Sequence, residues 1–203
     1  MIQIRKGIFE TNSSSTHAIC VSKEKPNIED VSIYGPYQFE ERPYCFSRCE
    51  SRLVDDFWDK LAYVYITVYT LSNESDSVIS GFEKSVEHIS EKYYTDDKYH
   101  PYNKKKLHDF LKSIEKEIIK GHAFVDHTEG LRGEFYERLI NDQGFLERLL
   151  FNDESYITIG GDEYRGYNIK TIGFEYDYHY PDDTFEKKLD EYRKGFDVYL
   201  KGN

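Results

Sequence analysis

The stretch GIFETNSSSTHAICV, from Gly7 to Val21, sets six small polar residues and one histidine between two short apolar runs. The polar run covers Thr11 to Thr16, and His17 follows it. Its side chains compete for backbone hydrogen bonds, so it cannot easily continue a helix or a strand. We therefore expect a strand over Met1 to Glu10, a polar turn, and a second strand from His17 to Val21.

Beyond this stretch, helical periodicity fills the middle of the chain. Apolar residues recur every three or four positions, and this spacing predicts amphipathic helices. The predicted helices run from Glu50 to Leu71, Ser75 to Tyr93, Asn103 to Lys120, Gly133 to Asn141 and Gly144 to Phe151. Within the first, the β-branched and aromatic residues from Tyr63 to Tyr69 leave a strand open as an alternative.

Strand patterns return near the C-terminus. They cover Ser155 to Ile159, Tyr167 to Tyr180 and Phe196 to Leu200, with a helix predicted over Phe185 to Lys194. Strands at both ends with helices between them predict an α+β fold. We expect one domain over residues 1–203, with a mostly antiparallel sheet built from N- and C-terminal strands and a helical insertion over roughly 50–151.

The charge is unevenly distributed. The chain carries a net charge of -11, but residues 1–25 hold four basic and two acidic residues, a net of +2, so the remainder sums to -13. An acidic body repels nucleic acid, so we expect no direct nucleic-acid binding. Such a charge suits plain solubility, or imitation of a nucleic-acid surface towards a basic protein. The 19 tyrosines could cover a core or present hydroxyl groups to a partner.

The location predicted from the sequence is the cytoplasm. The three cysteines (Cys20, Cys45 and Cys49) form no CxxC pair, which argues against a disulfide framework. No signal peptide is expected, and the longest apolar run, Ala62 to Tyr69, is too short to span a membrane.

The polar stretch is the leading candidate site. Consecutive small polar residues at a strand end can form a nest of backbone N–H groups that binds phosphate or another anion. The predicted ligand-binding residues are Arg5, Thr11, Asn12, Ser13, Ser14, Ser15, Thr16 and His17. The competing interpretation is a turn whose hydroxyls cap their own backbone. Catalysis by Ser15 and His17 is a third possibility, although no nucleophile-elbow motif is present.

Other candidates carry less specific patterns. A metal site could form from His122, Asp126 and His127 with Glu129 or His179, but surface histidines explain the spacing as well. Glu175, Asp177, Asp182 and Asp183 around His179 could form an acid–base or metal site, but alternation alone favours the wet face of an amphipathic strand. Gly160-Gly161-Asp162 favours a hairpin turn over a phosphate loop, and Lys104 to Lys106 favour a solvated helix face. We predict no cofactor and no metal.

The sequence RKGIFETNSSSTHAICV resembles the N-terminus of a group of uncharacterised proteins from phages and prophages of Gram-positive bacteria, whose members carry an FETNSSSTH motif. Leu149 to Glu163, LLFNDESYITIGGDE, is similar to a second stretch of that group. The resemblance implies a small accessory protein that acts in the bacterial host cytoplasm, and it implies no catalytic residues.

Three functions follow as expectations. The first is a non-enzymatic binding protein, an inhibitor of a host defence system, whose acidic, tyrosine-rich surface engages a basic host protein such as a nucleic-acid-binding defence protein. The second is a binder of a nucleotide or phosphate ligand at Thr11 to His17. The third is a phosphoester hydrolase or transferase that uses Ser/His or a metal.

Overall fold

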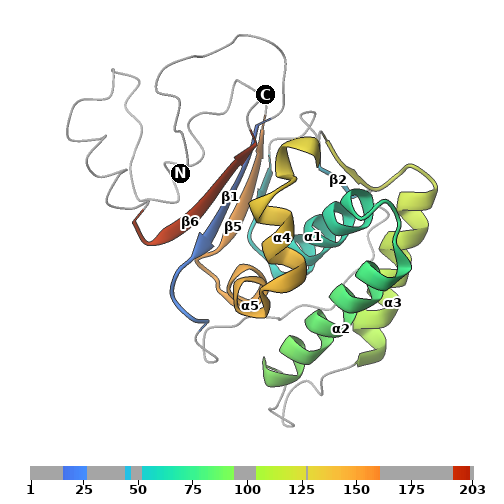
Figure 1. The fold of residues 1–203 in the computed structure, drawn as a ribbon, viewed down its shortest axis with the longest axis horizontal. Coiled ribbons are helices and arrows are strands. Elements are labelled where there is room, and N and C mark those ends of the chain that lie inside the picture. Colours follow the sequence, from blue (N-terminus) through green and yellow to red (C-terminus); the bar gives the residue numbers. More distant parts are fainter. Residues whose placement is uncertain are drawn as a thin grey trace.

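The computed structural model describes residues 16–26, 44–46, 52–93, 104–126, 128–160 and 194–201. Its main sheet has four strands, β1 (Thr16–Ser22), β3 (Arg52–Val54), β5 (Tyr156–Gly160) and β6 (Phe196–Lys201). Their order is β3-β5-β1-β6, and every neighbouring pair is antiparallel (Figure 1). The predicted α+β class with an antiparallel sheet is confirmed.

Strand β1 lies inside the sheet and pairs with β5 on one side and β6 on the other. Ile19 and Val21 are fully buried, and Ala18 and Cys20, which alternate with them, are 7% exposed. Both faces of the strand are therefore covered. The predicted strand over His17 to Val21 is confirmed and is one residue longer at each end.

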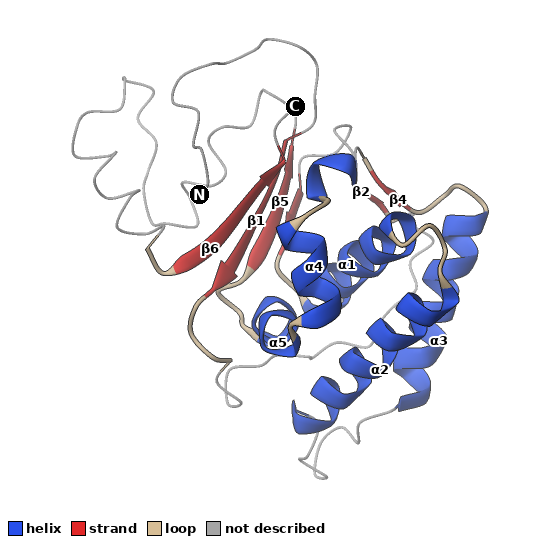
Figure 2. Ribbon diagram, in the orientation of Figure 1, coloured by secondary structure: helices blue, strands red, loops and turns tan. Residues whose placement is uncertain are grey.

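The five described helices lie on one side of this sheet (Figure 2). They are α1 (Phe57–Leu71), α2 (Asp76–Tyr93), α3 (Lys104–Ile119), α4 (Glu134–Asn141) and α5 (Gln143–Phe151). Helix α1 contacts each of the other four and is buried on nearly every side, with only Thr70 exposed. A helix that is apolar all round belongs in a core. The alternative of a strand over Tyr63 to Tyr69 is therefore wrong, because packing overrides the β-propensity of these residues.

The predicted start of the first helix is also wrong. Residues Arg52 to Val54 form the edge strand β3, in which Leu53 is 40% exposed and Val54 is fully buried. Asp56 has extended backbone geometry, and its carboxylate accepts a hydrogen bond of 3.0 Å from the backbone N–H of Asp59. This N-cap fixes the helix start after the strand.

The outer helices follow the sequence patterns closely. Helices α2 and α3 bury one apolar face each, and Gly121, with a φ of +74°, ends α3 as expected. Two residues of the next segment form β4 (Phe124–Val125), which pairs in parallel with β2 (Cys45–Phe46), and a 3₁₀ turn (Thr128–Leu131) follows.

Several predicted elements lie outside the described residues. These are the strands over Met1 to Glu10 and Tyr167 to Tyr180 and the helix over Phe185 to Lys194, of which only Lys194 is described, as part of a turn.

Candidate functional site

The histidine of the predicted anion site lies in the core. His17 is fully buried, and its Nδ1 atom shares a hydrogen bond of 2.8 Å with the hydroxyl of Tyr63 on α1. Phe46 packs edge-on against the same tyrosine ring, with 5.2 Å between the ring centroids. Burial raises the pKa of the Tyr63 hydroxyl, which therefore stays protonated at neutral pH. The imidazole joins β1 to α1 within the core.

The rest of the predicted site is only partly described. Thr16 begins β1, whereas Arg5 and Thr11 to Ser15 lie outside the described residues. Anion binding by this stretch stays a prediction. The same holds for a serine nucleophile, because Ser15 is outside the described ranges as well.

Pairing of β1 with β5 brings two sequence features together that lie far apart along the chain. Thr16 is opposite Gly160 and Cys20 is opposite Tyr156. The hydroxyl-rich stretch therefore enters the sheet beside the strand that leads to Gly160-Gly161-Asp162.

The turn between α5 and β5 forms hydrogen bonds to Ser22 at the C-terminal end of β1. Ser155 accepts a hydrogen bond of 2.9 Å from the backbone N–H of Ser22, and its hydroxyl donates one of 2.8 Å to the carbonyl of Arg148. Asn152 Oδ1 accepts one of 2.8 Å from the backbone N–H of Glu154, and the Ser22 hydroxyl donates to the Glu154 carboxylate at 3.3 Å. Polar residues of this turn thus serve the fold.

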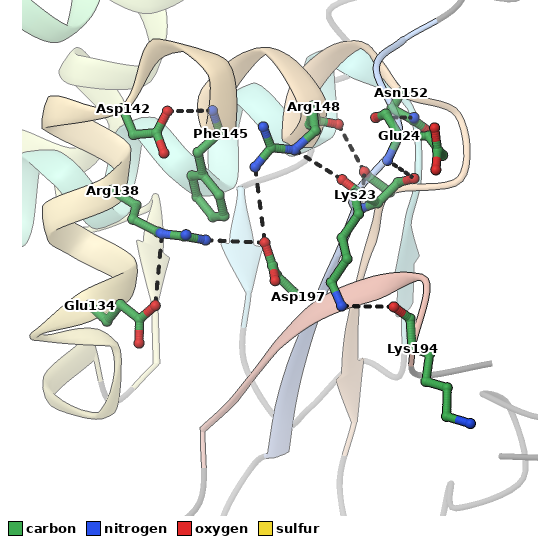
Figure 3. Close-up of polar contacts among 12 residues, drawn as sticks. Lys23, Glu24, Glu134, Arg138, Asp142, Phe145, Arg148, Asn152, Lys194 and Asp197 are labelled. Carbon is green, nitrogen blue, oxygen red and sulfur yellow. Dashed lines mark hydrogen bonds and ion pairs between the residues drawn. The ribbon is translucent and has the colours of Figure 1, made fainter. Parts of the chain in front are cut away.

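Two arginines meet one carboxylate beside this turn (Figure 3). Arg138 on α4 donates to Asp197 Oδ2 at 3.1 Å, and Arg148 on α5 lies 4.0 Å from the same oxygen. Arg148 Nε also donates to the carbonyl of Ser22 at 3.1 Å, and the Arg138 guanidinium lies 5.2 Å from the ring centroid of Phe145. Paired guanidinium groups suit carboxylate or phosphate ligands, but here Asp197 occupies them and ties β6 to both helices.

A buried lysine also donates hydrogen bonds to the turn between α5 and β5. Lys60 on α1 is 1% exposed, and its Nζ donates to the carbonyls of Asn152 and Ser155 at 3.1 Å each. Burial lowers the pKa of Lys60 to about 8, against the opposing influence of three nearby aspartates (Asp153, Asp56 and Asp55). An amine with such a pKa can act as a nucleophile, but burial and the two carbonyl contacts give this one a structural role.

The histidine candidates for a metal site are divided by the structure. His122 is exposed, and its Nδ1 lies 3.1 Å from Glu117 Oε2. Lys120 donates to the same carboxylate at 2.7 Å, and these two contacts, with Lys120 the larger influence, lower the pKa of Glu117. Asp126 is half-buried, and His127 is outside the described residues, as is the acidic cluster of Glu175, Asp177, His179, Asp182 and Asp183. Among the described residues, no three His, Cys, Asp or Glu side chains are placed to hold a metal ion.

The described tyrosines belong to the interior. Of the seven whose side chains are described, four are buried and three are half-buried. They are Tyr63, Tyr65, Tyr69 and Tyr156, followed by Tyr44, Tyr93 and Tyr136. Two of them link helices through carboxylates, since Tyr65 donates to Glu83 at 3.2 Å and Tyr93 donates to Glu147 at 2.8 Å. This part of the chain does not supply the exposed tyrosines that an aromatic binding surface needs.

Sequence reasoning missed Lys60, Arg148 and Asp197. One signal for Lys60 was present, because it stands one turn after Phe57 and before Val64 on an apolar helix face. Nothing in the sequence pattern pairs Arg148 with Asp197, which lie on elements far apart in the chain.

Comparisons with protein-family models, curated proteins and solved structures found no match for this chain. Within the described part, no helix is both long and apolar enough to cross a membrane.

Proposed function

We propose that this is a non-enzymatic accessory binding protein of phage or prophage origin, which acts in the cytoplasm of a bacterial host and inhibits a host defence system by binding one of its proteins. The burial of His17 supports the non-enzymatic part of this proposal. The one histidine of the hydroxyl-rich stretch is bonded to Tyr63 inside the core, so it is poorly placed to serve as a base for a solvent-borne substrate.

The charge of the chain supports a basic partner. A net charge of -11 steers a basic protein towards the surface and repels nucleic acid. Because the described tyrosines are buried or half-buried, the proposal rests on charge rather than on aromatic residues of this part of the chain.

The test measures how salt and surface charge change the capture of host proteins. We expect a basic protein from a Gram-positive lysate to be retained at 50 mM salt and lost at 500 mM, since salt screens such contacts. A variant with exposed carboxylates neutralised, Glu24→Gln, Glu74→Gln and Glu91→Gln, should retain less. The matched control is Lys25→Gln, Lys84→Gln and Lys194→Gln, which makes the chain more acidic and should retain at least as much. Binding that ignores salt and both variants would refute a charge-driven contact.

A second candidate function is binding of a nucleotide or another phosphate ligand at Thr11 to His17. The register that places Thr16 opposite Gly160 supports it, because the last residue of the polar run then lies beside a glycine. A panel of nucleotides should then raise the melting temperature of the wild-type protein but not of Ser13→Ala/Ser14→Ala. His17 is unsuitable for this test because it belongs to the core. A panel without effect on the wild type would exclude this candidate.

A further inference from the structure

The outward face of α3 carries a line of lysines. Lys105, Lys112 and Lys116 are all exposed and follow the spacing i, i+7 and i+11. At roughly 100° per residue, they lie within about 40° of one another around the helix axis. The exposed Asp109, one turn after Lys105, lies on the same face, so this face carries three positive charges and one negative charge. The buried residues of the helix, Leu107, Phe110, Leu111 and Ile114, lie on the opposite face.

These lysines have no ion-pair partner in the described part of the chain. Their neighbours do, since Lys104 pairs with Glu87 and Lys120 pairs with Glu117. Residues 104–120 contain six lysines against three acidic residues, a net of +3 in a chain of net charge -11. Allowing for Asp109, this face keeps a net charge of +2, and no ion pair within the described fold uses its three lysines.

An apolar residue ends the same face. Ile119 is 71% exposed, more than Leu53 at 40% or Phe124 at 42%, the other large exposed apolar residues described. Ile119 follows Lys112 by seven residues and Lys116 by three, so all three side chains share one side of α3. Ile119 therefore adds one apolar contact at the end of a charged helix face.

We propose that this lysine ridge, consisting of Lys105, Lys112, Lys116 and Ile119, docks an acidic α-helix of a partner protein. The charge of the ridge selects carboxylates, and its three lysines span about 16 Å in a straight line, which suits a second helix laid along the first. A membrane or a nucleic-acid duplex would also meet the acidic remainder of the chain, whereas a single helix meets only the ridge.

The proposal fixes the pattern of the partner helix. We place the helix antiparallel to α3, so that the dipoles of the two helices oppose each other. It then needs a leucine at its first position, opposite Ile119, and glutamates at positions four, eight and fifteen, opposite the three lysines in turn. Glutamine at the three glutamate positions gives a matched peptide without the charge.

The test uses these two synthetic peptides, labelled with fluorescein, and the full chain at 0.15 M salt, where repulsion beyond about 8 Å is screened. Wild type should bind the glutamate peptide more tightly than the glutamine peptide. Lys105→Glu/Lys112→Glu/Lys116→Glu should weaken binding of the glutamate peptide at least about tenfold, the combined effect of three exposed pairs. Ile119→Ser should weaken it about threefold.

The matched control is Lys25→Glu/Lys84→Glu/Lys194→Glu, which changes the net charge equally at exposed positions outside α3. It should leave peptide affinity within about twofold, and far-UV circular dichroism should show all variants folded. The proposal is overturned if both triple variants lose equal affinity, if neither peptide binds, or if the ridge variant loses binding only to anionic lipid vesicles or duplex DNA. The ridge variant should still capture the basic host protein, so this result and that of the proposed function can be told apart.

Discussion

Replacement of the buried Lys60 by methionine should remove a pH dependence from the stability of the fold. The wild-type amine is 1% exposed, and burial lowers its pKa from 10.5 to about 8. The unfolded chain therefore holds this proton more tightly than the native chain does. Between these two pKa values the unfolded state binds more protons, so native stability rises with pH. The full shift corresponds to about 3 kcal/mol.

The pH window of the experiment ends below the ordinary pKa of tyrosine, 10.0. From pH 7 to 9.5 the Lys60 contribution should grow by about 2 kcal/mol, since protonation of the unfolded chain is then still largely intact. The buried Tyr63 has a raised pKa, which opposes stability only above the ordinary tyrosine range. The free energy of unfolding is measured by urea titration at four pH values across this window.

The decisive comparison is between the free energies of unfolding of the wild type and of Lys60→Met across this pH window. We expect the wild type to gain about 2 kcal/mol relative to the variant over the window, at equal urea dependence. The exposed Lys84→Met serves as the control and should track the wild type at every pH. Wild-type and Lys60→Met curves that stay parallel to within about 0.5 kcal/mol would show that the buried amine titrates normally and would refute the reasoning.

Three further substitutions test other contacts. Tyr63→Phe removes the hydroxyl bonded to His17 and should lower the free energy of unfolding by about 1–2 kcal/mol in urea at pH 7, and an unchanged value would show that the bond contributes nothing. Ser90→Ala should leave stability unchanged or raise it by up to about 1 kcal/mol, because this buried hydroxyl has no hydrogen-bond partner among the described residues, and a clear loss of stability would argue for one. Asp197→Asn should cost about 1 kcal/mol at low salt and less at 0.5 M, since its contact with Arg138 is partly exposed, and a salt-independent cost would contradict an ionic contribution.

The parts of the fold that the sequence predicts are those with a single strong period. Helices α2 and α3 show one apolar stripe each, and their observed bounds lie within one residue of the predicted ones. Strand β1 was also predictable from its apolar alternation, and both of its faces are covered.

The errors share a physical cause, which is the position of α1 inside the molecule. A helix surrounded by a sheet and four helices has no polar face, so its periodicity is weak and its β-branched residues resemble a strand. Its start depends on the Asp56 cap, and the strand β3 before it depends on pairing with a segment more than 100 residues later. The local sequence indicates the helix start only weakly, and it does not indicate the pairing of β3 with β5 at all.

The predicted ligand-binding site shows even more clearly that local sequence does not reveal contacts between distant segments. Thr11 to His17 form one polar stretch in the sequence. In the structure, however, its last residue, His17, lies in the core. His17 bonds to Tyr63, and Ser22, further along the same strand, is held by Ser155 and Glu154. The partners on α1 and in the α5–β5 turn lie 46 to 133 residues away.

The polar residues of the turn between α5 and β5 support the end of β1. Asn152, Glu154 and Ser155 form hydrogen bonds to Ser22 at the end of β1, to Glu24 just beyond it, or within their own turn. A sequence motif that supports a strand pair in this way is sufficiently explained by the fold. Specificity for a partner would then be encoded outside it, on surfaces such as the lysine ridge of α3, where charge and apolar exposure serve no internal contact among the described residues. A direct comparison follows: ridge substitutions should alter partner choice while leaving the melting temperature unchanged, whereas Ser22→Ala and Ser155→Ala should lower the melting temperature and leave partner choice unchanged.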